Sequence, residues 1–393
     1  MASQRGAFIG IFVVTWLSLL TIGTTLPVLP KYVTGPIGGG DIAVGVVAGA
    51  FAATGLLFRP IAGAFADGRG RKPVVIVGSL LTAVSGALLF VPAGIPGLIV
   101  SRFVLGAGEG MVYTAGAAWI IDITPVHIRG RILGLYGLSI WGGLSLGPPV
   151  GELILSVSDF EYVWAFVTVL PLIGMLAAQR LPDNYSPPAP AQISGLSERF
   201  RRLIAREALG PGSALALAVI GYATTAAFIV LHLDDRGIGH GAFVFTIFAT
   251  MVVLTRIVGG GVADRLGGAR TAAASTLILA IGLLTLGFSG SLPVALIGAT
   301  AMGLGIGPLF PSLALMVLER VPEERRGAAM GTFTAFFDVG FGIGAPLAGI
   351  AVAVGGYGLA FVIAALLALT SSFVSLQLGR RRRLPIAATE GGG

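Results

Sequence analysis

The chain has 393 residues, of which 55% are hydrophobic and only 11% are charged. Soluble domains carry roughly 25% charged residues, and a soluble fold could not bury so much apolar surface. The composition therefore excludes a soluble protein and predicts an all-α membrane protein, because backbone polar groups in lipid must be satisfied within each segment. The sequence contains no cysteine, which excludes disulfides and thiol chemistry.

Apolar stretches long enough to cross a bilayer recur along the whole chain. A spanning helix needs about 20 mostly apolar residues. The expected spans are 7–32, 42–66, 74–92, 97–122, 131–155, 162–180, 211–233, 242–263, 271–289, 293–319, 327–353 and 357–379. The first stretch has no small-residue cleavage site behind it, so we expect a retained helix, with a cleaved signal peptide as the alternative.

The basic residues are distributed unevenly between the two sides of these spans. Most of the 25 Lys and Arg residues fall on the side of the N-terminus, and only Lys31 and Arg236 fall on the opposite side. This asymmetry predicts that both termini are cytoplasmic, in the cell (inner) membrane. The net charge of +7 thus reflects membrane topology and does not indicate a nucleic-acid partner.

The longest polar stretch, 181–210, divides the chain into two halves. We expect an N-terminal six-helix bundle over 1–180 and a C-terminal six-helix bundle over 211–383, followed by a disordered tail at 384–393. The linker begins with a proline cluster, which favours an extended chain. Its basic second part, 196–208, has the pattern of an amphipathic helix lying on the inner leaflet.

The two halves repeat each other at a constant offset of 197 residues, and the repeat includes the rarest residues of the spans. The matched positions are Arg59 with Arg256, Asp67 with Asp264, Asp122 with Glu319, Arg129 with Arg326, Gly143 with Gly340, Gly147 with Gly344, and Pro149 with Pro346. A parallel duplication of this kind predicts a transporter whose substrate binds near the bilayer midplane, between two similar halves.

A Gly-rich basic segment follows the second expected span. Residues 63–73 read GAFADGRGRKP, and residues 260–270 repeat the pattern in weaker form. This segment closely resembles the signature loop of the major facilitator superfamily, although Gly68 stands where the family often has Arg or Lys. With the helix count, the duplication and the central linker, the resemblance covers essentially the whole chain. It implies twelve transmembrane helices in two pseudo-symmetric six-helix bundles, and a monomer.

The resemblance also implies a cytoplasmic gate. Asp67 would help to latch the two halves when the cytoplasmic side is shut, with Arg71 and neighbouring charges as partners. The charges that would extend this network are Asp122, Arg129, Asp264, Glu319 and Arg326. The alternative is that these side chains only reach the aqueous inner surface. For Arg129 and Arg326 both interpretations stay open.

The fourth span begins with Ser101-Arg102 and reaches Gly106, which resembles the family's Arg-containing motif linked to proton transfer, apart from Leu105. Glu109 follows Arg102 by seven residues, on the same helix face and about 10 Å along the axis. That distance excludes direct contact unless the long Arg side chain or a water bridges it. Glu109 falls near mid-membrane, where charges are expensive and indicate function.

The fifth span resembles the superfamily motif Gly-x-x-x-Gly-Pro-x-x-Gly, which is typical of proton-coupled exporters. The residues that match are Gly143, Gly147, Pro148 and Gly151. The prolines would kink the helix, and the glycines would let it pack closely against the span at 242–263 or against the other half. Glu152 departs from the motif. Either it is a cavity acid or it reaches the outer surface.

Asp338 lies near the centre of the eleventh span, and its repeat partner is Trp141, so the acid is an addition to the shared scaffold. A carboxyl group inside the membrane can load and release a proton as its access to water alternates. The alternative is a hydrogen bond to a neighbouring helix without titration. The only cations in the spans are Arg59, Arg102 and Arg256. We expect Arg59 and Arg256 to reach towards the inner surface, with anion recognition as the alternative.

Several aromatic residues are candidates for lining a cavity, with ordinary helix packing as the alternative. They are Tyr113, Trp141, Tyr222 and Phe337. Arg59 is a further candidate for the cavity wall.

These patterns together predict a proton-coupled antiporter that exports a small organic solute. Asp338 and Glu109, with Glu152 and Arg102 as further candidates, would couple proton entry to solute release. The alternatives are a proton-coupled importer or a facilitator of a sugar-like or acidic solute and, in a different class, a channel or a receptor. The sequence shows no Walker A loop, catalytic triad, metal-ligand cluster or cofactor motif, so we expect no enzyme, and the energy must come from a gradient. The expected partners are the solute, protons and the bilayer.

Overall fold

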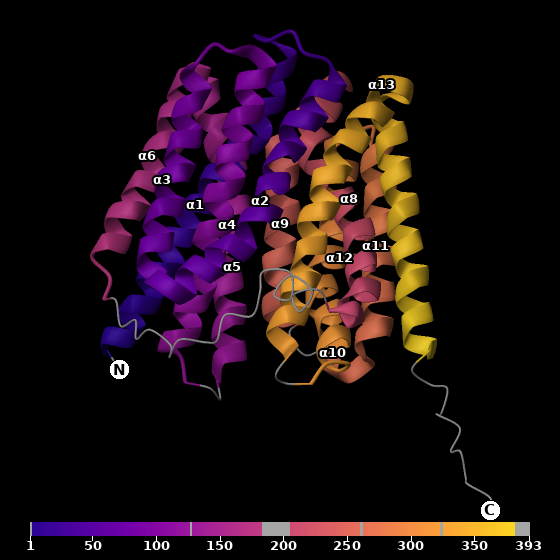
Figure 1. The fold of residues 1–393 in the computed structure, drawn as a ribbon. Coiled ribbons are helices and arrows are strands. Elements are labelled where there is room, and N and C mark those ends of the chain that lie inside the picture. Colours follow the sequence, from indigo (N-terminus) through magenta and orange to yellow (C-terminus); the bar gives the residue numbers. More distant parts are fainter. Residues whose placement is uncertain (1, 126–127, 183–204, 260–261, 323–324, 382–393) are drawn as a thin grey trace, which may run out of the picture.

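The computed structural model describes residues 2–125, 128–182, 205–259, 262–322 and 325–381, and all regular elements in these ranges are helices (Figure 1). The helices are α1 Ala2–Thr34, α2 Asp41–Arg69, α3 Arg71–Ala87, the short 3₁₀ helix η1 Leu88–Phe90, α4 Gly94–Ile123, α5 Arg129–Val157, α6 Phe160–Gln179, α8 Arg206–Asp235, α9 Gly241–Val258, α10 Val262–Leu266, α11 Gly268–Gly287, α12 Leu292–Leu318 and α13 Arg326–Arg381. The fold is all-α, as the composition predicts.

The last helix accounts for two membrane crossings. Within the described residues, 11 helices are long and apolar enough to cross a membrane. The one at Arg326–Arg380 in α13 has 55 residues, more than twice the length that one crossing needs. Gly355 and Gly356 interrupt α13 with non-helical backbone angles, and Gly356 has a positive φ of 77°. Because glycine has no Cβ, it adopts this conformation without steric cost. Counting α13 twice gives the twelve crossings that the sequence predicts.

Helices α1–α6 and α8–α13 lie in two bundles side by side (Figure 1). Within the halves the matched contacts are α1 with α5 and α8 with α13, and likewise α2 with α4 and α9 with α12. Between the halves the main contacts join α2 to α13 and α5 to α9. The two seams are related by the repeat, so the centre of the molecule lies between them.

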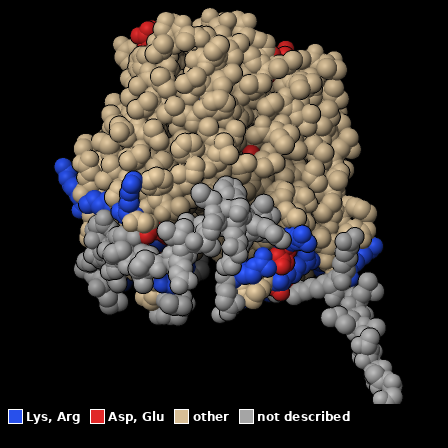
Figure 2. Space-filling view, in the orientation of Figure 1, with Lys and Arg blue, Asp and Glu red and all other residues tan. Residues whose placement is uncertain are grey.

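One end of the bundle is basic, and we call it the terminal end because α1 begins and α13 ends there. Lys and Arg side chains gather at this end in Figure 2, whereas the middle of the molecule shows a broad belt that is uncharged apart from one small acidic patch. Large apolar side chains are exposed on the long helices, among them Leu153, Ile297 and Phe373, each more than 60% exposed. An apolar belt with a basic rim at one end fits a protein surrounded by lipid.

The segment that resembles the signature loop is helical over most of its length, which corrects the sequence expectation of a helix that ends before Asp67. Helix α2 continues through Asp67 to Arg69, and the chain turns at Gly70, whose φ is 96°. Gly267 does the same in the second half, with a φ of 85°. There the expected span to 263 is also wrong, because α9 ends at Val258.

The glycines of the fifth span face α1, which corrects the expectation that they face the span at 242–263 or the other half. A Cβ on Gly143 would lie 2.7 Å from the backbone nitrogen of Leu20, and a Cβ on Gly147 would meet the backbone of Gly23. Gly151 meets Thr24 in the same way. Residues four apart share one helix face, so the contact between α5 and α9 uses a different face.

The second half begins earlier in the structure than the expected linker allows. Helix α8 begins at Arg206, four residues before the expected end of the linker at 210. Residues 183–204, which hold most of the expected amphipathic segment, and the expected tail at 384–393 lie outside the described residues.

Candidate functional site

A cavity of about 140 Å³ lies between the two halves. Its walls come from α1, α2, α4 and α5 on one side and from α8, α9, α12 and α13 on the other. Four charged residues line it, namely Arg59, Glu109, Arg256 and Asp338. Two cations and two acids therefore meet in an otherwise apolar space near the centre of the bundle.

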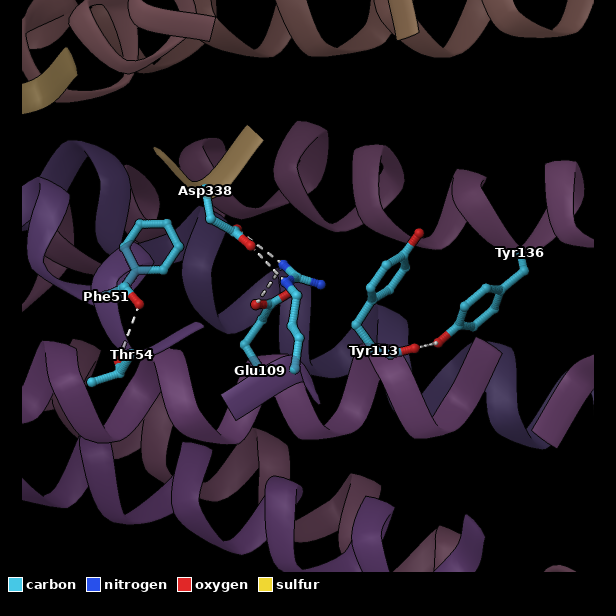
Figure 3. Close-up of polar contacts among 7 residues, drawn as sticks. Phe51, Thr54, Glu109, Tyr113, Tyr136 and Asp338 are labelled. Carbon is cyan, nitrogen blue, oxygen red and sulfur yellow. Dashed lines mark hydrogen bonds and ion pairs between the residues drawn. The ribbon is translucent and has the colours of Figure 1, made fainter. Parts of the chain in front are cut away.

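Arg59 on α2 holds Asp338 on α13 in a two-pronged ion pair. Its Nε donates to Asp338 Oδ2 at 2.7 Å, and its Nη2 donates to Asp338 Oδ1 at 3.2 Å. The same Nη2 donates to Glu109 Oε2 at 3.5 Å. In Figure 3 the carboxyl groups of Asp338 and Glu109 point to one place between their helices. The Arg59–Asp338 pair joins the two halves, because α2 and α13 belong to different bundles.

This cluster holds more negative than positive charge when both acids are ionised. The exposed fractions of the side chains are 18% for Arg59, 9% for Glu109 and 5% for Asp338. A buried charge without a partner is costly, and one guanidinium cannot neutralise two carboxylates. Adding one proton to either acid gives a neutral cluster. The arrangement can therefore bind a proton and, in doing so, change the strength of a contact between the halves.

Arg256 on α9 is the repeat partner of Arg59 and meets a different environment. Its Cζ lies 5.5 Å from the centroid of the Trp141 ring. Its Nε is buried and has no hydrogen-bond partner, and within the described part of the chain no acid forms an ion pair with it. Its contact residue Trp141 is the repeat partner of Asp338, so an aromatic ring replaces the acid here.

Aromatic rings form the remainder of the wall around Tyr222. The ring centroid of Tyr222 lies 5.6 Å from Trp141, 6.0 Å from Phe337 and 5.3 Å from Phe341. On the other side of the cavity Tyr113 lies under Arg59, with the Arg59 Cζ 5.4 Å from its centroid. The four aromatic candidates of the sequence analysis and Arg59 thus all lie on the cavity wall.

Tyr113 is held in place by a second tyrosine. Tyr136 stacks on it at 5.7 Å between centroids, and the Tyr136 hydroxyl donates to the backbone carbonyl of Tyr113 at 3.4 Å (Figure 3). Tyr136 also shares a hydrogen bond with Thr15 at 2.8 Å. These contacts connect the cavity wall to α1 and α5.

Arg102 does not reach Glu109. Its Nη1 donates to Thr25 Oγ1 at 3.3 Å, its Nε has no partner, and the side chain borders a separate small cavity of about 30 Å³. Glu109 is instead engaged by Arg59, and the seven-residue separation along α4 places Arg102 about 10 Å away along the axis. Arg102 and Glu109 therefore belong to different sites in this structure.

Glu152 lies at the end of the bundle opposite the terminal end and is not a cavity residue. Lys31 on α1 donates to Glu152 Oε1 at 2.7 Å. The same Lys31 Nζ lies 3.6 Å from Asp234 Oδ2 on α8. Lys31 therefore connects two acids from different halves. Of the two interpretations of Glu152, the structure supports the surface position.

The expected gate residues lie at the terminal end. Arg71 forms an ion pair with Asp67 at 2.5 Å and with Asp122 at 3.0 Å, all within the first half. Arg129 donates from its Nε to the backbone carbonyl of Thr124 at 3.1 Å. In the second half Glu319 caps the end of α12 and Arg326 begins α13. The side chain of Asp264 lies outside the described residues.

The comparison with known families identifies the fold. The family model described as Major Facilitator Superfamily matches residues 11–243 and 212–391. The chain belongs to the Major Facilitator Superfamily. It is therefore a membrane transporter of this superfamily, built from the two duplicated bundles described above, with a central cavity in the position expected for a substrate site.

Several relatives within the superfamily are similar over nearly their full length. A protein from Salmonella typhimurium named as an uncharacterized MFS-type transporter is 33% identical over 91% of this chain and 93% of the relative. A protein from Escherichia coli K12 with the same description is 30% identical over 97% of this chain and 95% of the relative. These similarities support membrane transport without indicating a solute.

Solved structures of superfamily members share the fold at low sequence identity. A point mutant of the nucleoside transporter NupG has a TM-score of 0.79 at 15% identity and covers 95% of this chain and 99% of its own. The human organic anion transporter MFSD10 (TETRAN) has a TM-score of 0.72 at 19% identity, with 95% and 99% covered. These likenesses establish the fold alone.

Sequence reasoning does not find the role of Arg59. It favours Arg59 and Arg256 side chains that extend to the inner surface and offers Arg59 as a further cavity candidate, whereas in the structure both side chains line the cavity. The available signal is the small number of charges within the spans. Buried acids require a cation, and Arg59 is one of only three candidates, but the sequence alone does not choose among them.

Proposed function

We propose that this superfamily member is a proton-coupled exporter of a small organic solute that works by alternating access. The main support for this proposal is the cluster of Arg59, Glu109 and Asp338, which lines the central cavity and joins the two halves. One chain supplies both sides of the cavity, which supports a monomer as the working unit.

Protonation of Asp338 is the proposed coupling step. A proton on Asp338 removes the negative charge that Arg59 holds in two hydrogen bonds, so an ion pair becomes a weaker contact between a cation and a neutral acid. The contact between α2 and α13 is then weaker at this point. Glu109 keeps Arg59 partnered, so the cation is not left alone in the cavity. The protonation state of one carboxyl thus biases how firmly the halves hold together.

We propose that the terminal end faces the cytoplasm, because the basic residues gather there. The opposite end is then the outer end, and the halves touch closely on that side. A Cβ on Gly49 would lie 2.8 Å from Pro346 Cδ, and a Cβ on Gly349 would lie 2.6 Å from the carbonyl oxygen of Asp41. Together with Lys31, these contacts support a state closed to the outside. Asp67, Arg71 and Asp122, which pair with one another within the first half here, are the proposed residues of the cytoplasmic gate.

Export is supported by the resemblance of the fifth span to the exporter motif. A second candidate is proton-coupled uptake of an acidic solute, which Arg256 favours because it lines the cavity without an acid partner. Exchange moves protons against the solute flow, whereas coupled uptake moves both in one direction. The direction of proton movement therefore separates the two candidates.

The test uses everted membrane vesicles with an imposed proton gradient and a panel of sugars, amino acids, aromatic carboxylates and cationic dyes. Exchange predicts that an exported solute dissipates the gradient, and that Asp338→Asn and Glu109→Gln each reduce this proton flux at least about tenfold, since they remove a coupling charge. Glu161→Gln, an exposed acid at the outer end of α6, is the matched control.

Coupled uptake predicts instead that right-side-out vesicles alkalinise the medium when the solute is added. Solute movement without any proton movement, equal in the parent and both variants, would contradict proton coupling in either direction.

A further inference from the structure

The repeat that relates the halves is broken at the cavity in one specific way. Arg59 and Arg256 are repeat partners and both line the cavity. The two acids that hold Arg59 have no acidic counterparts, since Trp141 stands in the place of Asp338 and Ile306 in the place of Glu109. Both replacements line the same cavity. Within the described residues, two acids therefore contact Arg59, and no acid contacts Arg256.

Arg256 is fixed against the cavity wall by an aromatic ring. Its guanidinium lies over Trp141, a contact that orients the cation without satisfying its N–H donors. Its buried Nε has no acceptor. Burying a cation away from any acceptor is costly, and the cavity is the space from which an acceptor can approach. A planar guanidinium presents paired donors that match a carboxylate.

We propose that Arg256 is the anion subsite of the central cavity and that the transported solute is a small organic anion, with a carboxylate at Arg256 and an apolar, flat body. This inference rests on the proposed transport function and specifies the solute class. The body would lie along the aromatic wall made by Trp141, Tyr222 and Phe337. In this wall the ring centroids of Trp141 and Phe337 lie 5.6 Å and 6.0 Å from that of Tyr222.

The charges around the cavity argue against a cationic solute. Both acids are already engaged by Arg59, so a solute cation would have to displace a bonded guanidinium while facing the positive charge of Arg256. A solute anion needs no displacement, because Arg256 has no acid to give up. A neutral solute could accept a hydrogen bond from Arg256 but would leave its charge without a counter-charge.

The test measures binding of 2-naphthoate to the purified full-length protein by isothermal titration calorimetry at one pH. The neutral 2-naphthalenemethanol has the same ring system without the carboxylate. We expect 2-naphthoate to bind and 2-naphthalenemethanol to bind at least about tenfold more weakly, the scale of hydrogen bonds to a charged group. Arg256→Gln should reduce 2-naphthoate affinity to the level of the alcohol, and Arg270→Gln, an exposed arginine at the start of α11, should not change it.

A second pair of variants tests the broken symmetry directly. Ile306→Glu places an acid at the position equivalent to Glu109, where it can neutralise Arg256, whereas Ile306→Gln has nearly the same shape without the charge. We expect Ile306→Glu to lose at least about ten times more 2-naphthoate affinity than Ile306→Gln. The comparison holds even when both variants are less stable, because they differ only in charge.

Equal binding of 2-naphthoate to the parent and to Arg256→Gln would overturn the proposal, and so would equal losses in the two Ile306 variants. Tighter binding of the alcohol than of the acid would also overturn it. These measurements need no proton gradient. A failed coupling assay with intact anion binding would therefore reject proton coupling alone, whereas intact coupling with no anion preference would reject the anion subsite alone.

Discussion

Arg59 contacts Asp338, and Arg256 contacts Trp141. The two contacts occupy equivalent places in the two halves, because Arg59 and Arg256 are repeat partners and Asp338 and Trp141 are too. At the first place a carboxylate accepts two hydrogen bonds. At the second place an aromatic ring offers only its π face. The duplicated scaffold brings an arginine to both sides of the cavity, and single substitutions on the facing helices decide what each arginine does.

This difference separates two tasks that a coupled transporter has to perform. A cation held by titratable acids responds to protons, and a cation without an acid is available to a solute. A symmetric cavity with acids on both sides would have no free cation, and one with aromatic rings on both sides would have no proton site. In the proposed mechanism, the asymmetry places the two kinds of site side by side in one cavity.

The largest effect that we expect comes from removing each arginine in turn. Arg59→Met leaves two buried acids without a cation and should lower the free energy of unfolding by about 3–5 kcal/mol. Arg256→Met removes a cation that has no acid partner, so stability should stay the same or rise. Thermal unfolding of the two purified variants in one detergent measures the difference. Equal destabilisation would show that the two arginines are equivalent after all.

The close glycine contacts of α5 with α1 and of α13 with α8 should respond equally to substitution, unlike the two sides of the cavity. Gly147→Ala forces a methyl group against Gly23 on α1, and Gly344→Ala forces one to within 2.9 Å of the Ile220 Cα on α8. Overpacking of this kind costs about 1–3 kcal/mol, so both variants should unfold at lower temperature. Gly134→Ala is the control, because a Cβ there meets nothing within 4 Å. A loss in only one half would contradict a shared scaffold.

A smaller effect should follow from changing the ring under Arg256. Trp141→Leu removes a cation–π contact of about 0.5–2 kcal/mol and loosens the orientation of the guanidinium. We expect 2-naphthoate affinity to fall about two- to thirtyfold, with Trp141→Phe intermediate because it keeps a ring. Titration calorimetry of both variants provides the values. Unchanged affinity in Trp141→Leu would mean that the ring does not position Arg256.

The smallest effect concerns the ion pairs of Lys31 with Glu152 and Asp234 at the end opposite the terminal end. They have no counterpart in the repeat, because Phe228 occupies the position equivalent to Lys31. Lys31→Gln removes partly exposed ion pairs worth about 0–1 kcal/mol. Since the chain has no cysteine, spin labels at Thr34→Cys and His240→Cys report the separation of the halves. We expect a modest increase in the population with separated outer ends, and high salt should produce a similar increase in the parent because it screens the same ion pairs. A closer approach of the two labels in Lys31→Gln would contradict a latch.

The lipid environment, the number of crossings and the duplication could be predicted from the sequence, because hydropathy and the 197-residue repeat depend only on the order of residues. The sequence also predicted that Glu109 and Asp338 lie near the middle of their spans, since the rise along a helix places them there. It determined the glycine face at 143, 147 and 151 as a close-packing surface, although not the helix that this surface meets.

The sequence did not show which helices meet or how each helix is rotated about its axis, because both depend on tertiary packing. In lipid the apolar side chains have no preferred inner side, so the hydrophobic pattern does not fix the rotation of a helix. That rotation turns Arg59 towards Asp338, 279 residues away, and leaves Arg102 beside Thr25 instead of Glu109. It also sets Arg256 over Trp141. The charged residues of the cavity could be identified in the sequence. Which of them contact one another depended on how the twelve crossings pack.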